Sequence, residues 1–366
     1  MRAKSARITL ALAVATATAG TALTCAQVAL AGTAVVPVPC RATALAAAIT
    51  GAVSGETLSL ARGCTYELTA ALPAVHASLA IRGNGAAIER SFAAGTPDFS
   101  LLLLLSGTKT LAVSNLSFRN GDDPTVGGAI DNFQGSAVTV DGGTFAGNTA
   151  GVGGAIANTS GGTLIVRGAH FTGNSAGDGG AIANIAGATV TGSVFTGNTA
   201  LFGGAIYNDE GATMAVTRSQ FRDDQASSNG GGIYNDYHLA VAGSRITGNG
   251  AARLGGGIFN ETDGIATVTG TTISRNHAGF GGGIDNEDAM TVTDSTIALN
   301  SGAGGGIYTD WLLAVTDSRI TRNTGGGLYN GNDWGQPGKV TLTRTAVSGN
   351  QPYNCEPVNS ITGCTG

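Results

Sequence analysis

Hydrophobic residues recur along this chain at intervals much longer than one helical turn. The clearest unit is a glycine pair followed by a small residue and isoleucine, as in Gly203-Gly204-Ala205-Ile206. Its isoleucine or leucine occurs nine times at spacings of 21 to 27 residues, at Ile130, Ile156, Ile182, Ile206, Ile233, Ile258, Ile284, Ile307 and Leu328. A period of this length is typical of one complete unit in a solenoid, so the pattern predicts stacked coils.

Two further apolar runs follow each of these residues and predict two more strands in every coil. The second run carries Val140, Val166, Val190, Val216, Val241, Val268, Val292, Val315 and Leu342. The third run carries Phe145, Phe171, Phe195, Phe221, Ile246, Ile273, Ile297, Ile320 and Val347. These mostly β-branched or aromatic columns predict three sheets whose inward faces fill a long core. Because short loops exclude helical crossovers, the sequence predicts an all-β fold, a parallel β-helix of about twelve coils.

The first part of the chain is less regular and predicts a cap with opening coils. Arg41 to Ile49 is rich in alanine and has Leu45 and Ile49 four residues apart. This spacing predicts a short helix that covers the open edge of the sheet. Brief alternating runs predict strands at 57–60, 66–68, 78–81 and 110–113.

The N-terminus has the features of a secretory signal at 1–31. A basic head with Arg2, Lys4 and Arg7 precedes an apolar run that is too short for a membrane span, and no later stretch competes with it. Removing this segment takes away three of the 19 basic residues and none of the 24 acidic ones, which leaves a formal charge of −8. Such a charge disfavours nucleic acid as a partner. We therefore expect a secreted, monomeric protein without a transmembrane span.

Four cysteines remain after loss of the signal segment, and Cys25 is removed with it. Four cysteines allow three pairings, among which closeness in sequence favours Cys40 with Cys64 and Cys355 with Cys364. The predicted parts are thus a signal peptide at 1–31, a cap with irregular coils at 32–125, regular repeats at 126–350 and a disulfide-bonded tail at 351–366.

Two columns of asparagine accompany the apolar columns. The first comprises Asn132, Asn158, Asn184, Asn208, Asn235, Asn260, Asn286 and Asn330, with Thr309 in the remaining coil. The second comprises Asn148, Asn174, Asn198, Asn249, Asn276, Asn300, Asn323 and Asn350, with Asp224 in the remaining coil. Stacked amides donate to and accept from neighbouring coils, so we interpret both columns as structural ladders.

These motifs carry a family resemblance. The glycine unit followed by FxxN, as in Gly153-Gly154-Ala155-Ile156 with Phe171-Thr172-Gly173-Asn174, resembles the repeat of the polymorphic outer membrane proteins. More broadly, the chain is similar over about residues 115–350 to the right-handed parallel β-helix proteins grouped with pectin lyase. The resemblance implies a right-handed coil. It does not select an activity, because that superfamily includes polysaccharide lyases, glycoside hydrolases, tailspikes and adhesins.

One side of the first strand is a candidate binding face. The residue after each isoleucine is expected to point outward, and in the last six coils it is Tyr207, Tyr234, Phe259, Asp285, Tyr308 and Tyr329. Two residues further along, an acidic row comprises Asp209, Asp236, Glu261, Glu287 and Asp310, with Trp311 and Trp334 near its end. Exposed rings suit stacking of sugars, and repeated carboxylates suit a calcium ion. The alternative is an external stacking ladder beside a hydrated turn.

The sequence patterns for catalysis are weaker than those for binding. The resemblance implies that a lyase would need a basic residue near an acidic sugar, and after loss of the signal only Lys109 and Lys339 remain as lysines. Arg222, Asp223 and Asp224 form the best local constellation for acid–base chemistry, although Asp224 belongs to an asparagine column.

The histidines show no metal-ligand spacing. Outward threonine pairs such as Thr189 with Thr191 occur in only four of nine coils, so a structural or ice-binding solenoid is a minor alternative. The hypothesis favoured is non-enzymatic binding of extracellular polysaccharide or a cell surface, with a polysaccharide lyase or glycoside hydrolase as the alternative.

Overall fold

The computed structural model describes residues 34–104, 107, 109–331, 338–357 and 361–364. The chain separates into two units, Met1–Thr33 and Ala34–Gly366, and the description concerns the second. The predicted signal peptide and Trp334 lie outside the described residues. Among the residues described, no helix is long and apolar enough to cross a membrane.

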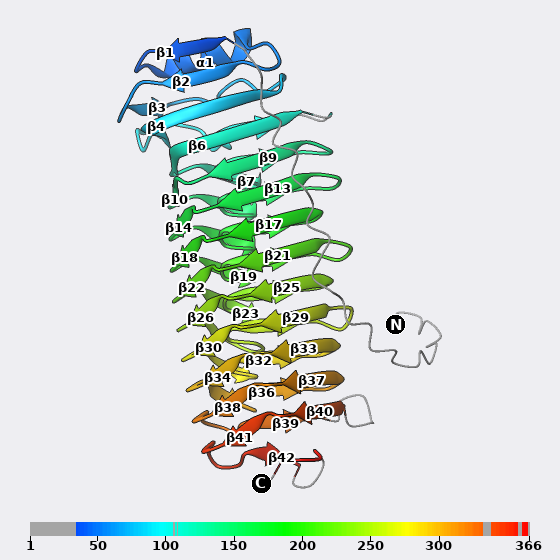
Figure 1. The fold of residues 1–366 in the computed structure, drawn as a ribbon. Helices are drawn as coiled ribbons and strands as arrows, with labels where there is room; N and C mark the ends of the chain where they lie inside the picture. The colour runs from blue at the N-terminus through cyan, green and yellow to red at the C-terminus, as the bar shows by residue number, and fades with distance from the viewer. Residues whose placement is uncertain (1–33, 105–106, 108, 332–337, 358–360, 365–366) are drawn as a thin grey trace, which may run out of the picture. The chain divides into compact units, whose positions relative to one another are not determined.

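The described unit is a parallel β-helix whose coils stack from β1 to β42 (Figure 1). Its largest sheet, sheet A, has 23 strands. The opening strands of sheet A are β1 (Val35–Val38), β2 (Thr57–Leu60), β3 (Thr65–Leu68), β4 (Leu79–Arg90) and β6 (Thr110–Arg119).

In the regular coils, each turn contributes a five-residue and a three-residue strand to sheet A. The five-residue strands are β9 (Ala137–Asp141), β13 (Thr163–Arg167), β17 (Gly187–Thr191), β21 (Thr213–Thr217), β25 (His238–Ala242), β29 (Ile265–Thr269), β33 (Ala289–Thr293), β37 (Leu312–Thr316) and β40 (Lys339–Thr343). The three-residue strands are β10 (Thr144–Ala146), β14 (His170–Thr172), β18 (Val194–Thr196), β22 (Gln220–Arg222), β26 (Arg245–Thr247), β30 (Thr272–Ser274), β34 (Thr296–Ala298), β38 (Arg319–Thr321) and β41 (Ala346–Ser348).

Two further sheets complete each coil. Sheet B contains the isoleucine column in β5 (Leu102–Leu104), β8 (Ile130–Asn132), β12 (Ile156–Asn158), β16 (Ile182–Asn184), β20 (Ile206–Asn208), β24 (Ile233–Asn235), β28 (Ile258–Asn260), β32 (Ile284–Asn286), β36 (Ile307–Thr309), β39 (Leu328–Asn330) and β42 (Cys355–Glu356). Sheet C comprises β7 (Asp122–Val126), β11 (Thr149–Val152), β15 (Ser175–Asp178), β19 (Thr199–Phe202), β23 (Gln225–Asn229), β27 (Gly250–Ala251), β31 (His277–Phe280) and β35 (Ser301–Ala303).

The division into sheets differs from the prediction. The second and third apolar runs were assigned to separate sheets, but they belong to one, because β4 and β6 continue through both runs. Sheet C was not predicted at all. Its strands have few apolar residues and little alternation, so the hydrophobic pattern carries no signal for them.

The core follows the three predicted columns. Successive isoleucines of sheet B are direct register partners, as Ile130, Ile156 and Ile182 show, and all are fully buried. The phenylalanine column stacks from Phe118 to Phe221 with ring centroids 4.7–5.0 Å apart. Each such buried side chain stabilises the fold by about 1.5–3 kcal/mol relative to exposure.

The N-terminal end has the predicted helix. Helix α1 (Ala42–Gly51) buries Leu45 and Ile49 against the first coil, and the predicted disulfide between Cys40 and Cys64 is confirmed. An unpredicted strand, β1, precedes the helix and pairs in parallel with β2. The proline within this strand, Pro37, is tolerated because β1 lies at the edge of the sheet.

Both asparagine columns form the predicted ladders. In sheet B, each Nδ2 donates to the Oδ1 of the next coil at 2.7–2.9 Å from Asn132 to Asn286, and Asn286 donates to the Thr309 hydroxyl at 2.9 Å. The second ladder runs from Asn148 to Asn350 with Asp224 among its members. Each net hydrogen bond contributes about 1 kcal/mol.

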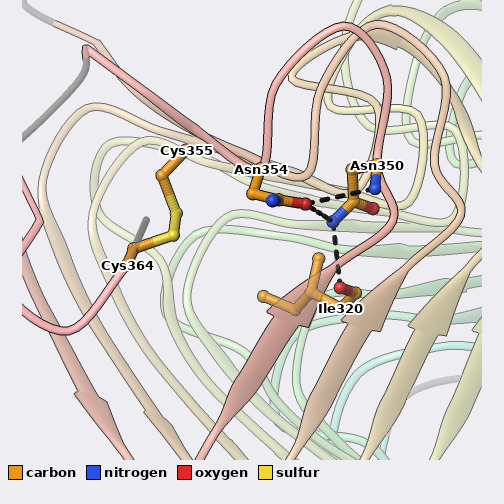
Figure 2. The surroundings of a disulfide bond; sticks show 5 residues. All are labelled: Ile320, Asn350, Asn354, Cys355 and Cys364. Carbon is orange, nitrogen blue, oxygen red and sulfur yellow. Dashed lines mark hydrogen bonds between the residues drawn. A yellow bond between two sulfur atoms is a disulfide. The ribbon is translucent and has the colours of Figure 1, made fainter. Parts of the chain in front are cut away.

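The second ladder ends on the C-terminal tail. Figure 2 shows Asn350 donating from Nδ2 to the Ile320 carbonyl at 3.0 Å and to the Asn354 Oδ1 at 3.2 Å. Asn354 thus supplies the acceptor that a further coil would provide. The adjacent disulfide between Cys355 and Cys364 confirms the second predicted pairing and ties this tail together.

Candidate binding face

The outward side of sheet B lies against a tight turn. Before each sheet B strand from β8 to β39, a glycine adopts a positive φ. At Gly203 the φ is 65°, and a Cβ at this position would collide with the Ile206 carbonyl. Only glycine fits such a conformation together with such a close approach. The turn brings the ends of sheet C strands beside sheet B, and Phe202 consequently contacts Tyr234 with ring centroids 5.4 Å apart.

The aromatic row is more buried than predicted, and the expectation of an exposed stripe is wrong for three of its members. Tyr234, Phe259 and Tyr308 have exposed fractions of 6%, 1% and 7%. Adjacent rings are in contact, with centroid distances of 4.9 Å from Tyr207 to Tyr234 and 5.1 Å from Tyr234 to Phe259, both pairs tilted, and 5.1 Å for the stacked pair Tyr308 and Tyr329. Tyr207, Tyr329 and Trp311 remain half-buried.

The acidic row is accessible over four coils. Asp209, Asp236, Glu261 and Glu287 are half-buried, whereas Asp310, which we expected in the same exposed row, is buried. Asp310 is buried because Gly331 of the following coil lies directly against its carboxyl group. The four accessible carboxyl groups and the Tyr207 ring together form what we term the acidic face.

Contacts within the acidic face link the two rows. The Tyr207 hydroxyl donates a hydrogen bond to Asp209 Oδ1 at 3.0 Å. Burial, followed by the charge of Asp209, raises the pKa of Tyr207 well above its usual value. The hydroxyl therefore stays protonated and remains a donor to the carboxylate at neutral pH.

The electrostatic character of the acidic face is uniformly negative. Burial raises the pKa of Asp236 to about 6, and the charges of Asp209 and Asp263 add to this effect. Burial likewise raises the pKa of Glu261, with a further contribution from Asp263. The seven residues that start at each column isoleucine from Ile206 to Ile307 include nine Asp or Glu and no Lys or Arg.

The carboxylates of the acidic row do not form a compact metal site. Within the parts of the chain that the structure describes, no group of three or more His, Cys, Asp or Glu side chains is placed to hold a metal ion. The acidic row is spread along the coils instead of converging on one point.

A second pair of carboxyl groups was missed in the sequence. Asp131 occupies the outward column of sheet B but is only 5% exposed, and its Oδ1 has no hydrogen-bond partner. Burial, with the charge of Asp123, raises the pKa of Asp131 to about 7. Asp123 accepts a hydrogen bond from the Ser100 hydroxyl at 2.9 Å. The sequence contained one signal for this pair. Asp131 is an acidic residue in a column where the adjacent coils have the apolar Leu103 and Ala157.

The candidate catalytic residues do not converge. Arg222, the last residue of β22, and Asp223, on the turn that follows, are both exposed, and Arg222 donates to Gln220 at 3.2 Å. Asp224 is fully buried within the second ladder. A substrate therefore has no access to a pair formed by Asp223 and Asp224, and the acid–base interpretation of this constellation is wrong. The interpretation of Asp224 as a ladder residue is confirmed by its hydrogen bonds to Asn198.

The threonine pairs lie on the outward side of sheet A without continuity. The register partners of Thr189 in the next two coils are Ala215 and Ala240, before Thr267 resumes the column. A regular threonine array is thus absent from these coils.

One coil of the chain matches a known repeat family. Residues 192–209, which span β18 to β20, match the Chlamydia polymorphic membrane protein repeat. The repeat resemblance drawn from the glycine and FxxN motifs is thereby confirmed. Comparison with curated protein sequences finds no match.

Two solved structures align with the chain at low sequence identity. An alginate lyase from Paenibacillus sp. str. FPU-7 aligns at 15% identity over 86% of this chain and 96% of its own, with a TM-score of 0.42. The PL6 family alginate lyase AlyGC aligns at 13% identity over 78% of this chain and 52% of its own, with a TM-score of 0.32. Both are parallels in architecture only. The two disulfides, together with the repeat match, indicate an extracellular or outer-surface protein.

Proposed function

We propose that this protein is secreted and binds an extracellular glycan or cell-surface polymer through the acidic face without cleaving it. The observation that carries the proposal is the charge of that face. Four accessible carboxyl groups form a row over four successive coils, the first of them accepts a hydrogen bond from Tyr207, and the surrounding segments contribute no Lys or Arg. Tyr329 and Trp311 extend the surface with half-buried rings at its C-terminal end.

The same charge argues against a polyuronate-cleaving enzyme. Elimination from an acidic sugar requires neutralisation of its carboxylate and a base that removes a proton. The acidic face offers like charge to a polyanion, so it disfavours such a substrate unless cations bridge the two. A neutral polymer, or one with protonated amino groups, fits the face better. Secretion is supported by the basic and apolar character of residues 1–31 and by the two disulfides.

Retention on immobilised polymers tests the proposal. The chain from Gly32 onward would be passed over partially deacetylated chitin, a neutral glucan and a polyuronate, each with calcium and with chelator. We expect retention on the amino polymer or the glucan and no new chain ends in any mixture. New reducing ends or unsaturated products would replace binding with a hydrolase or lyase. Absence of retention on every polymer would refute the proposal.

Matched variants locate the site. Asp209→Asn with Asp236→Asn removes two carboxylates from the acidic face, and we expect retention to fall at least tenfold. The control pairs Asp223→Asn with Asp294→Asn, because both residues are exposed on turns of sheet A and give the same change in net charge. Equal loss of retention in both double variants would show that only overall charge matters.

A further inference from the structure

One coil replaces an asparagine of the second ladder with an acid. Asp224 is fully buried and follows the three-residue strand β22, at the position that Asn198 and Asn249 occupy in the coils before and after. Its Oδ1 accepts hydrogen bonds from the main-chain N–H and the Nδ2 of Asn198, both at 2.8 Å. Its own N–H donates to Asn249 Oδ1 at 2.9 Å. The acid therefore takes the same orientation as its amide neighbours.

The remaining oxygen of Asp224 lies where every other coil has an amide donor. Elsewhere in the ladder, Nδ2 bonds both the Oδ1 of the next coil and a main-chain carbonyl of the coil before. Asn174 shows both bonds, to Asn198 Oδ1 at 2.9 Å and to the Phe145 carbonyl at 3.1 Å. By the same register, Asp224 Oδ2 faces Asn249 Oδ1 and the Phe195 carbonyl. Oδ2 has no hydrogen-bond partner and is buried.

We propose that Asp224 is present in the ladder as a protonated carboxylic acid, whose Oδ2 hydrogen replaces an amide hydrogen, and that its ionisation makes this coil a pH-sensitive element of the fold. The reason for the proton is that Oδ2 lies among hydrogen-bond acceptors. An ionised carboxylate has no hydrogen to donate, so Oδ2 would face two other acceptors in a dry environment. A proton on Oδ2 converts one of these contacts into a hydrogen bond.

Among the described residues, the only charge that acts on the Asp224 carboxyl group is that of Asp223. The ladder neighbours Asn198 and Asn249 are neutral, and the adjacent core column presents the apolar Phe195, Phe221 and Ile246. On the same turn, Asp223 adds negative charge, while the side chain of Arg222 is exposed on the outside. On sheet C, Gln225 follows Asp224, and the His277 ring lies over Gly250 beside Gln225.

The direction of the pH effect follows from these surroundings. Burial raises the pKa of Asp224 to about 7. The hydrogen bonds from Asn198 and from the main chain of Arg222 oppose this rise, and the charge of Asp223 adds to it. In the unfolded chain, the same carboxyl group loses its proton near its usual pKa of 3.8. Between these two values, the folded protein holds a proton that the unfolded chain has lost. The contribution of Asp224 to stability is therefore greatest below about pH 4, falls up to about pH 7 and then becomes level.

Urea unfolding between pH 4 and pH 9 tests the proposal by comparing the wild type with Asp224→Asn. The asparagine restores the repeat, so this variant is expected to fold. Relative to it, the unfolding constant of the wild type should rise about tenfold per pH unit from pH 4 to 7. The total is roughly a thousandfold, or about 4 kcal/mol at 1.36 kcal/mol per pH unit. Parallel curves for the two proteins would overturn the proposal.

Two further variants separate Asp224 from other acids. Asp223→Asn removes the adjacent exposed carboxyl group and should keep most of the pH dependence. If Asp223→Asn flattened the curve as fully as Asp224→Asn, the effect would arise from surface charge and the proposal would fail. In the Asp224→Asn background, Asn249→Asp moves the acid one coil along the ladder and should restore the pH dependence. An infrared difference spectrum at pH 5 should also show a protonated carboxyl band that Asp224→Asn removes.

Discussion

Replacement of Tyr234 distinguishes packing from binding in the aromatic row. The sequence suggested that this ring is an exposed platform for sugars, but its exposed fraction is 6%. Its ring meets Tyr207, Phe259 and Phe202 at centroid distances of 4.9, 5.1 and 5.4 Å. Tyr234→Ala would therefore leave a cavity and remove three ring contacts.

The expected cost follows from these contacts. Truncation of a large buried aromatic residue to alanine costs about 3–5 kcal/mol. We expect about 3 kcal/mol for Tyr234→Ala, at the lower end, because the ring lies on the outer side of sheet B, where the surface can relax. Tyr234→Phe keeps the ring and its neighbours, so it should cost less than about 1.5 kcal/mol.

Urea unfolding followed by circular dichroism measures both variants, with retention on the polymer panel measured at zero urea. The midpoint should fall for Tyr234→Ala with little change in slope. Retention should persist while the protein is folded. A cost below about 0.5 kcal/mol together with lost retention would refute the packing argument and restore the ring as a contact for the ligand.

Three further predictions concern stability. Asn174→Ala removes four ladder hydrogen bonds and should cost about 4 kcal/mol in urea unfolding; a cost below about 1 kcal/mol would contradict the ladder. Leu299 has a φ of 62°, a left-handed conformation that asparagine adopts more readily than leucine, so Leu299→Asn should stabilise by about 1 kcal/mol in the same assay. Burial raises the pKa of Asp131 to about 7, so its ionisation lowers stability between about pH 4 and 7. Asp131→Asn should make the fall in the melting temperature over this range smaller, because only the contribution of Asp224 then remains, and an unchanged pH profile would contradict it.

The coils were predictable because each apolar column places one residue per coil. Ile206 and Ile233, 27 residues apart, are direct register partners, and so are Val216 and Val241 at a different spacing. The spacing varies because turns differ in length, while the columns stay aligned. The ladders were predictable for the same reason, since each asparagine side chain forms a hydrogen bond with the asparagine side chain of the next coil.

Sheet C and the buried rings were not predictable from the same pattern. Strands such as Ser175–Asp178 are short and poor in apolar residues, so neither periodicity nor propensity marks them. Parity correctly placed Tyr234 on the outer side of sheet B. It does not reveal that the glycine turn at Gly230 brings the chain against that side, since a turn's path depends on backbone angles.

Differences between coils indicate the proposed binding face better than the repeated positions do. Ala183 and Tyr207 are register partners in adjacent strands, so the stacking of coils accepts either residue at this position. The change to tyrosine coincides with the first carboxylate of the acidic row, Asp209. Ring packing accounts for the aromatic residues, but it does not account for the acids. Carboxylates about 4.8 Å apart in water repel each other by about 1 kcal/mol per pair. We propose that the bound polymer offsets this repulsion over the four coils of the acidic row.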